Sequence, residues 1–542
     1  MPEKMSKVRS FLSSVRPGVV LEVIIAAVPT LIALWLASHE LGRRSPWFDE
    51  LMSFRDLRWP LWEILLNTHG KHPPGAYVFF KLAWELAGSL VSMRFVSVLF
   101  FTATIPFTYL IGRRVHSPMA GVIAAFWTAI HVNFLGQAHE MRHYAILLFG
   151  GSAVFYSILV LYDKLEAGRK IKAGFIILMC LAVLLFVNTQ LFSMLHLAGI
   201  AVIALMYALS AAARGRKDIL KIFGTLALVL VVVAGISSYK VVSNAARRAM
   251  GKGKSVAASK DNSSFADRND NAWRKDLGKA KKQENTLKKY QKNVSGFLFM
   301  TTFMRPWQWL YIAPLILIAM VGAGFSAHER IPWLFAWSFT PLVIMLFVPM
   351  FHFPAGKYLI CGTHGTIILA STAPAMALEY IWKSLKQEGN WKKTMLPVAA
   401  VFLVGFFSLH QFITQRAAQD YYVYLTGHLE QWSEVFSYIN RHSEKGDVAV
   451  FAPDDVHGVT ELMHVNPDLI TMRASEAPGR LNRANQVWLI SSHASRGKAR
   501  MDLMKALKSA KKGRRKAGLR LADRIGQRRM WGDIQVQRFR RR

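Results

Sequence analysis

The sequence predicts an all-α polytopic membrane protein that carries a small soluble α/β domain at its C-terminal end. Hydrophobic residues make up 52% of the 542 positions. They gather in about eleven runs, most of them close to the roughly 20 residues that cross a ~30 Å hydrocarbon core. The runs stop before residue 414, and mixed helix-like and strand-like patterns follow. The chain therefore divides into a membrane domain, residues 1–413, and a C-terminal domain, residues 414–542.

The expected spans share a high apolar content and few charged residues. They cover residues 19–38, 93–112, 119–135, 144–162, 173–188, 191–210, 219–238, 306–325, 332–351, 360–382 and 395–413. Residues 74–89 form a further apolar segment, but Lys81 and Glu85 would be costly at mid-bilayer. We expect this segment to be a helix that lies along the membrane surface.

Basic loops set the expected orientation. The N-terminus, the pair Arg113–Arg114 and the Lys- and Arg-rich stretches near 164–172, 214–221 and 383–393 all fall on one side of the expected spans. Short cytoplasmic loops carry such an excess of Lys and Arg. We therefore expect a multi-pass protein of the cell (inner) membrane, with its N-terminus in the cytoplasm. Residues 39–92, residues 239–305 and the C-terminal domain are then outside.

The C-terminal domain shows a helical pattern around QWSEVFSYINRH, then the strand-like runs DVAVF and QVWLIS, then a basic helix near 498–511 and a basic tail, 512–542. The formal net charge is +35. In a membrane protein, such a charge favours anionic lipid headgroups as partners, and we expect no nucleic-acid partner. The two cysteines, Cys180 and Cys361, lie in or beside apolar runs. They indicate neither a disulfide framework nor a cysteine-based zinc site.

The sharpest chemical signal is the pair Asp49–Glu50 in SPWFDELMSF, just past the first span. One carboxylate next to a membrane can accept a proton from an attacking hydroxyl, while the other orients that hydroxyl or holds a cation. A divalent cation near Asp49 is therefore the one cofactor that we consider. On composition alone, a solvated acidic pair is the simpler account.

Three other segments of the expected outer face carry candidate substrate-binding residues. They are THGKHPPGAYVFF with His72, HEMRHY with Glu140, Arg142 and Tyr144, and GKYL with Lys357 and Tyr358. Arginine grips phosphate through two parallel hydrogen bonds. Each segment could equally have only a structural role, because Arg, Lys and Tyr commonly anchor helices at the membrane interface. Two histidines without a matched carboxylate indicate no metal site.

The order of these motifs resembles that of the GT-C glycosyltransferases related to protein mannosyltransferases and to the bacterial aminoarabinose and Rgt-type transferases. WFDE follows the first span, HPPGAYVFFKL precedes a helix with Arg94 and Ser97 in an R-x-x-S pattern, and HEMRHY resembles an E-x-R-x-Y step. The resemblance is best over residues 15–210.

The resemblance implies transfer of a sugar, with inversion, from a polyprenyl-phosphate donor to a hydroxyl acceptor that is a lipid, a glycan or a protein. Asp49 takes the position of the base and Glu50 that of the neighbouring carboxylate. Arg142 and Lys357 become the expected phosphate contacts, although Lys357 stands where an Arg-Tyr pair would be expected. A transporter or lipid flippase is the main alternative, and a non-catalytic envelope assembly protein is another. Both leave Asp49 without chemistry.

Overall fold

In the computed structural model, the described residues are 17–39, 41–42, 46, 48–66, 73–190, 192–216, 218–220, 222–225, 235, 330–347, 359–387, 432–452, 457, 459–462, 466–473, 485–491, 519–525 and 535–541. The expected spans at 306–325 and 395–413 and most of that at 219–238 lie outside them. So do the loop 239–305 and the basic helix near 498–511.

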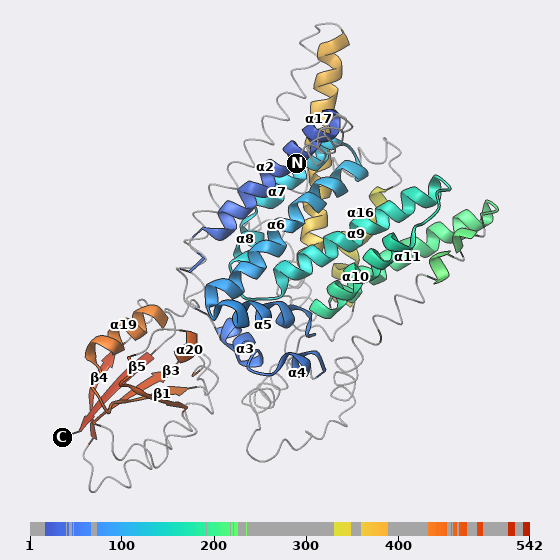
Figure 1. Ribbon diagram of the computed structural model, residues 1–542. Coiled ribbons are helices and arrows are strands. Elements are labelled where there is room, and N and C mark those ends of the chain that lie inside the picture. Colours follow the sequence, from blue (N-terminus) through green and yellow to red (C-terminus); the bar gives the residue numbers. More distant parts are fainter. Residues whose placement is uncertain are drawn as a thin grey trace, which may run out of the picture.

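Seven of the expected spans are helices in the structure. They are α2 (Pro17–Ser38), α6 (Leu90–Val115), α9 (Tyr144–Glu166), α10 (Ala173–Thr189), α11 (Ser193–Ala213), α16 (Ile331–Phe347) and α17 (Ile360–Gln387). Within the described part of the chain, α6, α9 and α11 are long and apolar enough to cross a membrane. These helices lie together as one bundle (Figure 1). The total of about eleven spans stays a prediction.

The span expected at 119–135 is not one helix. Instead, α7 (Pro118–Ile130) ends at His131, and the short α8 (Val132–Ala138) begins immediately after it. The backbone of His131 is extended, with ψ of 114°, so the helical hydrogen-bond ladder is interrupted there. The His131 ring is buried beside Phe134, at 4.5 Å between ring centroids. Hydropathy alone predicts one continuous span over 119–135, because the single residue His131 hardly lowers the mean hydropathy of the run.

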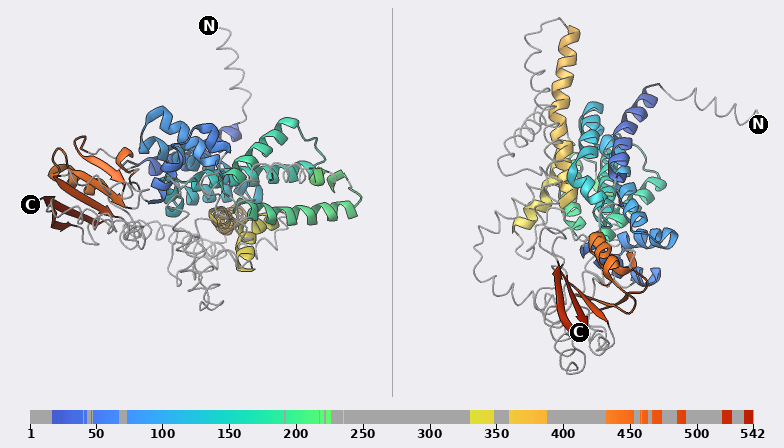
Figure 2. Two further views of the ribbon diagram at one scale, coloured as in Figure 1. Left: turned by 90° about the horizontal axis from the view of Figure 1, so that it is seen from below. Right: turned by 90° about the vertical axis from the view of Figure 1, so that its left-hand side faces the viewer.

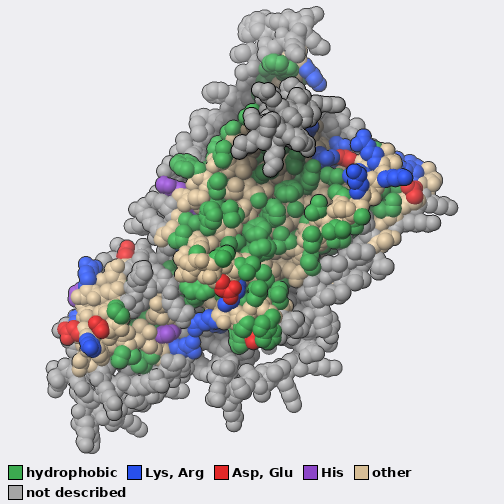
Figure 3. Space-filling view, in the orientation of Figure 1, with side chains coloured by type: hydrophobic (Ala, Val, Ile, Leu, Met, Phe, Trp, Pro, Cys, Tyr) green, Lys and Arg blue, Asp and Glu red, His purple; other side chains and the backbone are tan. Residues whose placement is uncertain are grey.

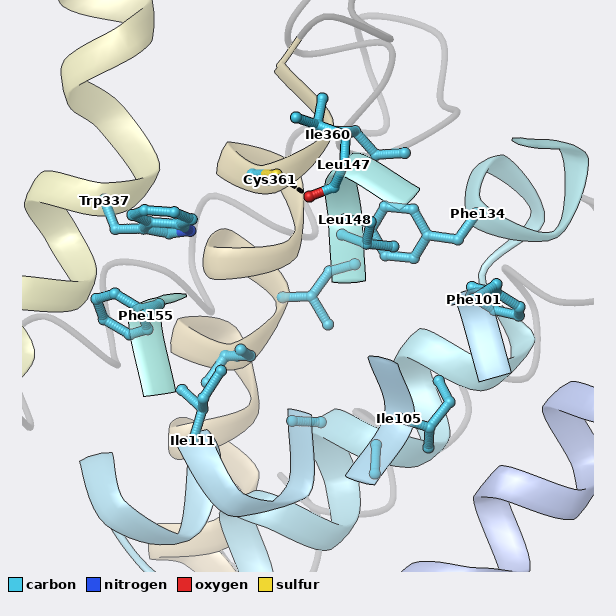
Figure 4. Close-up of a cluster of buried hydrophobic side chains, with 14 of the residues drawn as sticks. Phe101, Ile105, Ile111, Phe134, Leu147, Leu148, Phe155, Trp337, Ile360 and Cys361 are labelled. Carbon is cyan, nitrogen blue, oxygen red and sulfur yellow. Dashed lines mark hydrogen bonds between the residues drawn. The ribbon is translucent and has the colours of Figure 1, made fainter. Parts of the chain in front are cut away.

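The bundle core is built from large apolar side chains and from glycines at helix contacts. Phe101, Phe134, Phe155 and Trp337 come together from different helices, and Cys361 of α17 donates to the carbonyl of Leu147 at 3.6 Å (Figure 4). Small residues let helix backbones approach closely in a membrane. Glycines at the contact points therefore allow α6 to lie close to α7 and α9 to lie close to α17.

Ion pairs join the helix ends at one end of the bundle. Arg113 at the end of α6 pairs with Glu22 near the start of α2. Asp163, near the end of α9, pairs with Arg114, and with Arg330 before α16 at 2.8 Å. Lys and Arg side chains gather toward this end on the face shown in Figure 3, whereas hydrophobic side chains cover the middle. We call this the basic end.

The first expected outer region lies at the opposite end and forms three helices: α3 (Phe48–Asp56), α4 (Leu61–Leu66) and α5 (Gly75–Ala87). Helix α5 ends at Gly88, whose φ of 58° is left-handed. Its 13 residues span about 20 Å, which is too short for a ~30 Å hydrocarbon core. A surface helix, rather than a further span, therefore fits residues 74–89.

The C-terminal domain contains α19 (Trp432–His442), β1 (Val448–Ala452), α20 (Val459–Leu462), β2 (Ile470–Arg473), β3 (Gln486–Ser491), β4 (Leu519–Ile525) and β5 (Gln535–Arg541). The sheet order is β2-β1-β3-β5-β4. Strands β1, β2 and β3 run parallel, whereas β5 is antiparallel to both β3 and β4. The domain lies at the end of the bundle opposite the basic end, beside α3 (Figures 1 and 2).

Two parts of the basic tail expected at 512–542 are strands of the sheet, β4 and β5, and the rest of that range lies outside the described residues. Arg538 of β5 is buried, donates to the Gln486 side chain at 2.7 Å and stacks on Trp488 at 4.9 Å. In the sequence, the charge of RFRRR masks the strand-like alternation of VQRF. A strand can bury an arginine when its stem packs on an aromatic ring and its head is hydrogen-bonded.

Candidate active site

The carboxylate pair Asp49–Glu50 lies in the first turn of α3. In a helix, residues four apart share a face and successive residues are turned by about 100°. Asp49 therefore shares a face with Ser53, Glu50 shares one with Phe54, and Leu51 points to a third side. Adjacent carboxylates on this helix consequently have different surroundings.

Glu50 is fully buried in an ion pair with Arg94 of α6. Arg94 Nε donates to Glu50 Oε1 at 2.9 Å, and Nη2 donates to Oε2 at 2.7 Å. The backbone N–H of Met141 donates to Oε1 at 2.8 Å, and Arg94 Nη1 donates to the Leu41 carbonyl at 3.1 Å. This bidentate ion pair, together with the Met141 hydrogen bond, connects α3 to α6 and to the segment that carries Arg142. Glu50 thus holds the site together and does not face an open substrate space.

Asp49 faces Arg142, and the two side chains differ in exposure. The closest carboxylate–guanidinium approach is 3.7 Å, from Asp49 Oδ2 to Arg142 Nη2. The Asp49 side chain is 32% exposed, whereas that of Arg142 is 7% exposed. Arg142 Nη1 donates to Ser53 Oγ at 2.8 Å and to the Asp49 carbonyl at 3.1 Å. The site therefore offers a reachable carboxylate beside a cation fixed by α3.

Two tyrosines complete the surroundings of Arg142. Its guanidinium lies 5.9 Å from the centre of the Tyr144 ring. Burial raises the pKa of Tyr77 to about 12, although Arg142 opposes that shift. Burial also disfavours charge on Arg142, but Asp49, Tyr144 and Tyr77 raise the pKa of the guanidinium above its usual value. Arg142 is therefore charged at any physiological pH, and its Nε has no hydrogen-bond partner among the described residues.

The backbone of Glu140 is held by α6, because Ser97 Oγ donates to the Glu140 carbonyl at 2.7 Å. Ser97 and Arg94 are one helical turn apart, so one face of α6 fixes both α3 and the segment 140–142. The structure thus brings Asp49, Glu140, Arg142 and Tyr144 to one end of the bundle. His72, Lys357 and Tyr358 lie outside the described residues.

A cation held jointly by Asp49 and Glu50 does not fit this arrangement. Glu50 is turned toward Arg94, whereas Asp49 lies beside the Arg142 guanidinium. Across the described ranges, no group of three His, Cys, Asp or Glu side chains could hold a metal ion.

Sequence patterns alone do not single out Ser53 and Tyr77, which contact or surround Arg142 in the structure. Ser53 could have been found from its position four residues after Asp49, which places both on one helical face. Tyr77 gave no such signal, because its place beside Arg142 depends on how α5 packs against α3.

Comparison with known proteins identifies the fold. The sequence matches no protein-family model and no curated protein. Among solved structures, apo ArnT from Cupriavidus metallidurans is similar over 96% of this chain and 97% of its own, with a TM-score of 0.51 at 12% identity. The same protein bound to undecaprenyl phosphate matches with a TM-score of 0.42.

The oligosaccharyltransferase AglB from Archaeoglobus fulgidus, solved with an inhibitory peptide and a dolichol-phosphate, matches 90% of this chain and 72% of its own. Its TM-score is 0.45 at 13% identity. The likeness to ArnT runs through the bundle and the C-terminal domain alike, since it covers nearly all of both chains. This chain therefore has the fold of the GT-C membrane glycosyltransferases.

Proposed function

We propose that this protein is a membrane glycosyltransferase. It moves a sugar from a polyprenyl-phosphate donor to a hydroxyl acceptor at the outer face of the membrane, with inversion at the anomeric carbon. The observation that carries this proposal is the pairing of a reachable carboxylate, Asp49, with a buried guanidinium, Arg142, at one end of a GT-C bundle.

The chemistry of the two groups suits this reaction. The acceptor oxygen attacks the anomeric carbon while Asp49 takes the hydroxyl proton, so Asp49 ends the step protonated. The bond from that carbon to the phosphate oxygen breaks, and polyprenyl phosphate leaves with the electron pair. The Arg142 guanidinium stabilises the charge that grows on the phosphate. Its Nε is a donor that no described residue uses.

The remaining sequence candidates keep supporting roles in the proposal. Lys357 serves as a second phosphate contact, Tyr358 as a further substrate-binding residue, and His72 as a further contact of the donor phosphate. Tyr144 and Glu140 shape the surroundings of Arg142. The Lys and Arg residues at the basic end meet anionic lipid headgroups. The acceptor is a lipid, a glycan or a protein, and the sugar is a hexose or a pentose.

The experiment is transfer of labelled sugar from a polyprenyl-phosphate donor in membranes, with the amount of folded protein measured. Asp49→Asn keeps size and polarity but cannot accept the proton. We expect turnover to fall at least about a hundredfold, as for loss of a general base, with the donor KM unchanged. Arg142→Ala should raise the donor KM and slow the transfer, since the phosphate loses its cation.

Glu85→Gln is the matched control. Glu85 is a carboxylate of the same outer region, 52% exposed on α5 and paired with Lys81 at 3.3 Å. Its removal should leave turnover unchanged. Full activity of a folded Asp49→Asn protein would remove Asp49 as the base. Donor binding by the unmodified protein without any transfer would favour the transporter alternative.

A further inference from the structure

Leu51 of α3 packs against the C-terminal domain. It is 1% exposed, although it follows two charged residues in a nine-residue helix. It belongs to the apolar cluster of the C-terminal domain, whose other members are Trp432, Val435, Phe436, Ile439, Ala449, Phe451, Val459, Leu469, Trp488, Ile490 and Val536. One leucine of the first outer region is thus part of a core built by residues more than 380 positions later.

Three consecutive residues therefore direct α3 to three different neighbours. Asp49 faces Arg142, Glu50 pairs with Arg94 in the bundle, and Leu51 enters the core of the C-terminal domain. Since a helix turns by about 100° per residue, these contacts surround the first turn. Because Leu51 and Asp49 lie two residues apart in one helix, a movement of the helix at Leu51 also moves Asp49.

The orientation of the sheet agrees with this contact. Strand β5 ends beside the C-terminus, on the side of the domain that faces away from the bundle, and β3 runs antiparallel to β5 (Figure 1). The carboxyl ends of β3 and of its parallel neighbour β1 therefore point toward the bundle. Helix α20, which contributes Val459 to the cluster, follows β1 on that side.

We infer that the C-terminal domain positions the catalytic helix α3, and that Leu51 is the positioning residue through which it acts. This inference rests on the proposed function, in which Asp49 is the base. The domain packs Leu51 away from water, and the buried Glu50–Arg94 pair fixes another face of the helix. Asp49 is thereby held at one distance from Arg142. A base displaced by about 1 Å can lose roughly a hundredfold in rate.

Leu51→Ala tests the contact, because it removes apolar contact and leaves Asp49, Glu50 and Ser53 in place. We expect turnover per folded molecule to fall about tenfold to a hundredfold, with the donor KM held within about twofold because Arg142 remains. Leu51→Met, which is close in volume, should retain most of the activity. Amide hydrogen exchange of residues 48–56 should rise in Leu51→Ala while that of α6 and α9 does not.

Val459→Ala removes apolar contact from the same cluster, but on the side of the C-terminal domain. If both residues act through one contact, the double variant should be little slower than the slower single variant. Leu65→Ala is the matched control, since Leu65 lies in the neighbouring helix α4 and is 52% exposed. It should change neither turnover nor exchange in α3.

The outcomes separate the inference from the proposed function. If the unmodified protein transfers no sugar, the proposed function fails, but the exchange measurement still tests the docking of α3. If it transfers sugar and Leu51→Ala keeps full turnover and unchanged exchange, the positioning role is wrong. A purely structural leucine would lower only the yield of folded protein. Should Leu51→Ala not fold, Leu51→Val removes less volume and the same readouts apply.

Discussion

The buried pair Glu50–Arg94 shows why neighbouring carboxylates take different roles. Both side chains are at most 2% exposed, and the contact is two-pronged. Removing two charges from water is costly, and their attraction offsets that cost only when the geometry is good and the other polar atoms are bonded. Here a backbone N–H and a carbonyl supply such bonds. Glu50 is therefore committed to Arg94, whereas Asp49 is 32% exposed and accessible for the proposed role of base.

Breaking this pair should destabilise the fold rather than merely slow a reaction. Glu50→Gln leaves Arg94 buried without its countercharge, and we expect it to lower the free energy of unfolding by about 3–5 kcal/mol. Arg94→Gln should do the same from the other side. The double variant should be less destabilised than the sum of the two, since no lone charge remains. Denaturant unfolding in detergent measures all three, and additive effects would contradict the coupling.

The sequence could predict that Asp49 and Arg142 lie close together. Each follows an expected span, and both spans end on the same side of the membrane. The sequence could not predict that Glu50 turns away. That outcome depends on the register of α3 against α6, which brings Arg94 to Glu50 and Ser97 to the backbone of Glu140. The carboxylates look equivalent in the sequence and differ only once the helix faces are known.

Among the elements, α6 and α7 cross at a pair of glycines. A Cβ on Gly121 would lie 2.4 Å from the Tyr109 carbonyl oxygen, and one on Gly112 would lie 2.8 Å from the Gly121 Cα. Both contacts are with backbone atoms, which cannot move aside as a flexible side chain does. The close approach of these helices therefore requires glycine at both positions.

Gly121→Ala should open this crossing. Overpacking of a tight contact costs about 1–3 kcal/mol, which exceeds the gain of up to about 1 kcal/mol in helix propensity. We expect a lower unfolding temperature and a lower yield of folded protein. Gly174→Ala is the control, because a Cβ at this glycine of α10 meets nothing within 4 Å. That variant should be as stable as the parent protein or slightly more so. Equal stability of both variants would contradict the steric argument.

The elements differ in how far the sequence could predict them. Long apolar runs gave the bundle helices, because burial in lipid or core leaves a strong signal over some 20 residues. The break at His131 was missed, since one extended residue hardly changes that signal. The many basic residues of β4 and β5 obscure their strand pattern in the sequence. Arg538 is buried only because Trp488 and Gln486 of β3 receive it, and the local sequence carries no trace of that pairing.

For the whole molecule, the ion pairs fix which helix ends lie together. Glu22, near the start of α2, meets Arg113, near the end of α6. Asp163, near the end of α9, meets Arg330, which precedes α16. These ends lie together only if alternate helices run in opposite directions, as the basic loops predict. The candidate active site and the C-terminal domain then share the other end. The surplus of Lys and Arg at the basic end predicts that this end faces the cytoplasm.

Cysteine labelling in intact cells would decide the orientation, once Cys180 and Cys361 are replaced by serine or alanine. Arg58→Cys lies exposed after α3, and Ala167→Cys lies exposed in the turn after α9 at the basic end. Because short cytoplasmic loops retain Lys and Arg, a membrane-impermeant reagent should modify position 58 in intact cells and position 167 only after permeabilisation. Labelling of both from the same side would break the alternation on which the shared site rests. The reverse pattern would keep the fold but place Asp49 in the cytoplasm, and a lipid-phosphate donor would then have to be used from the inner leaflet.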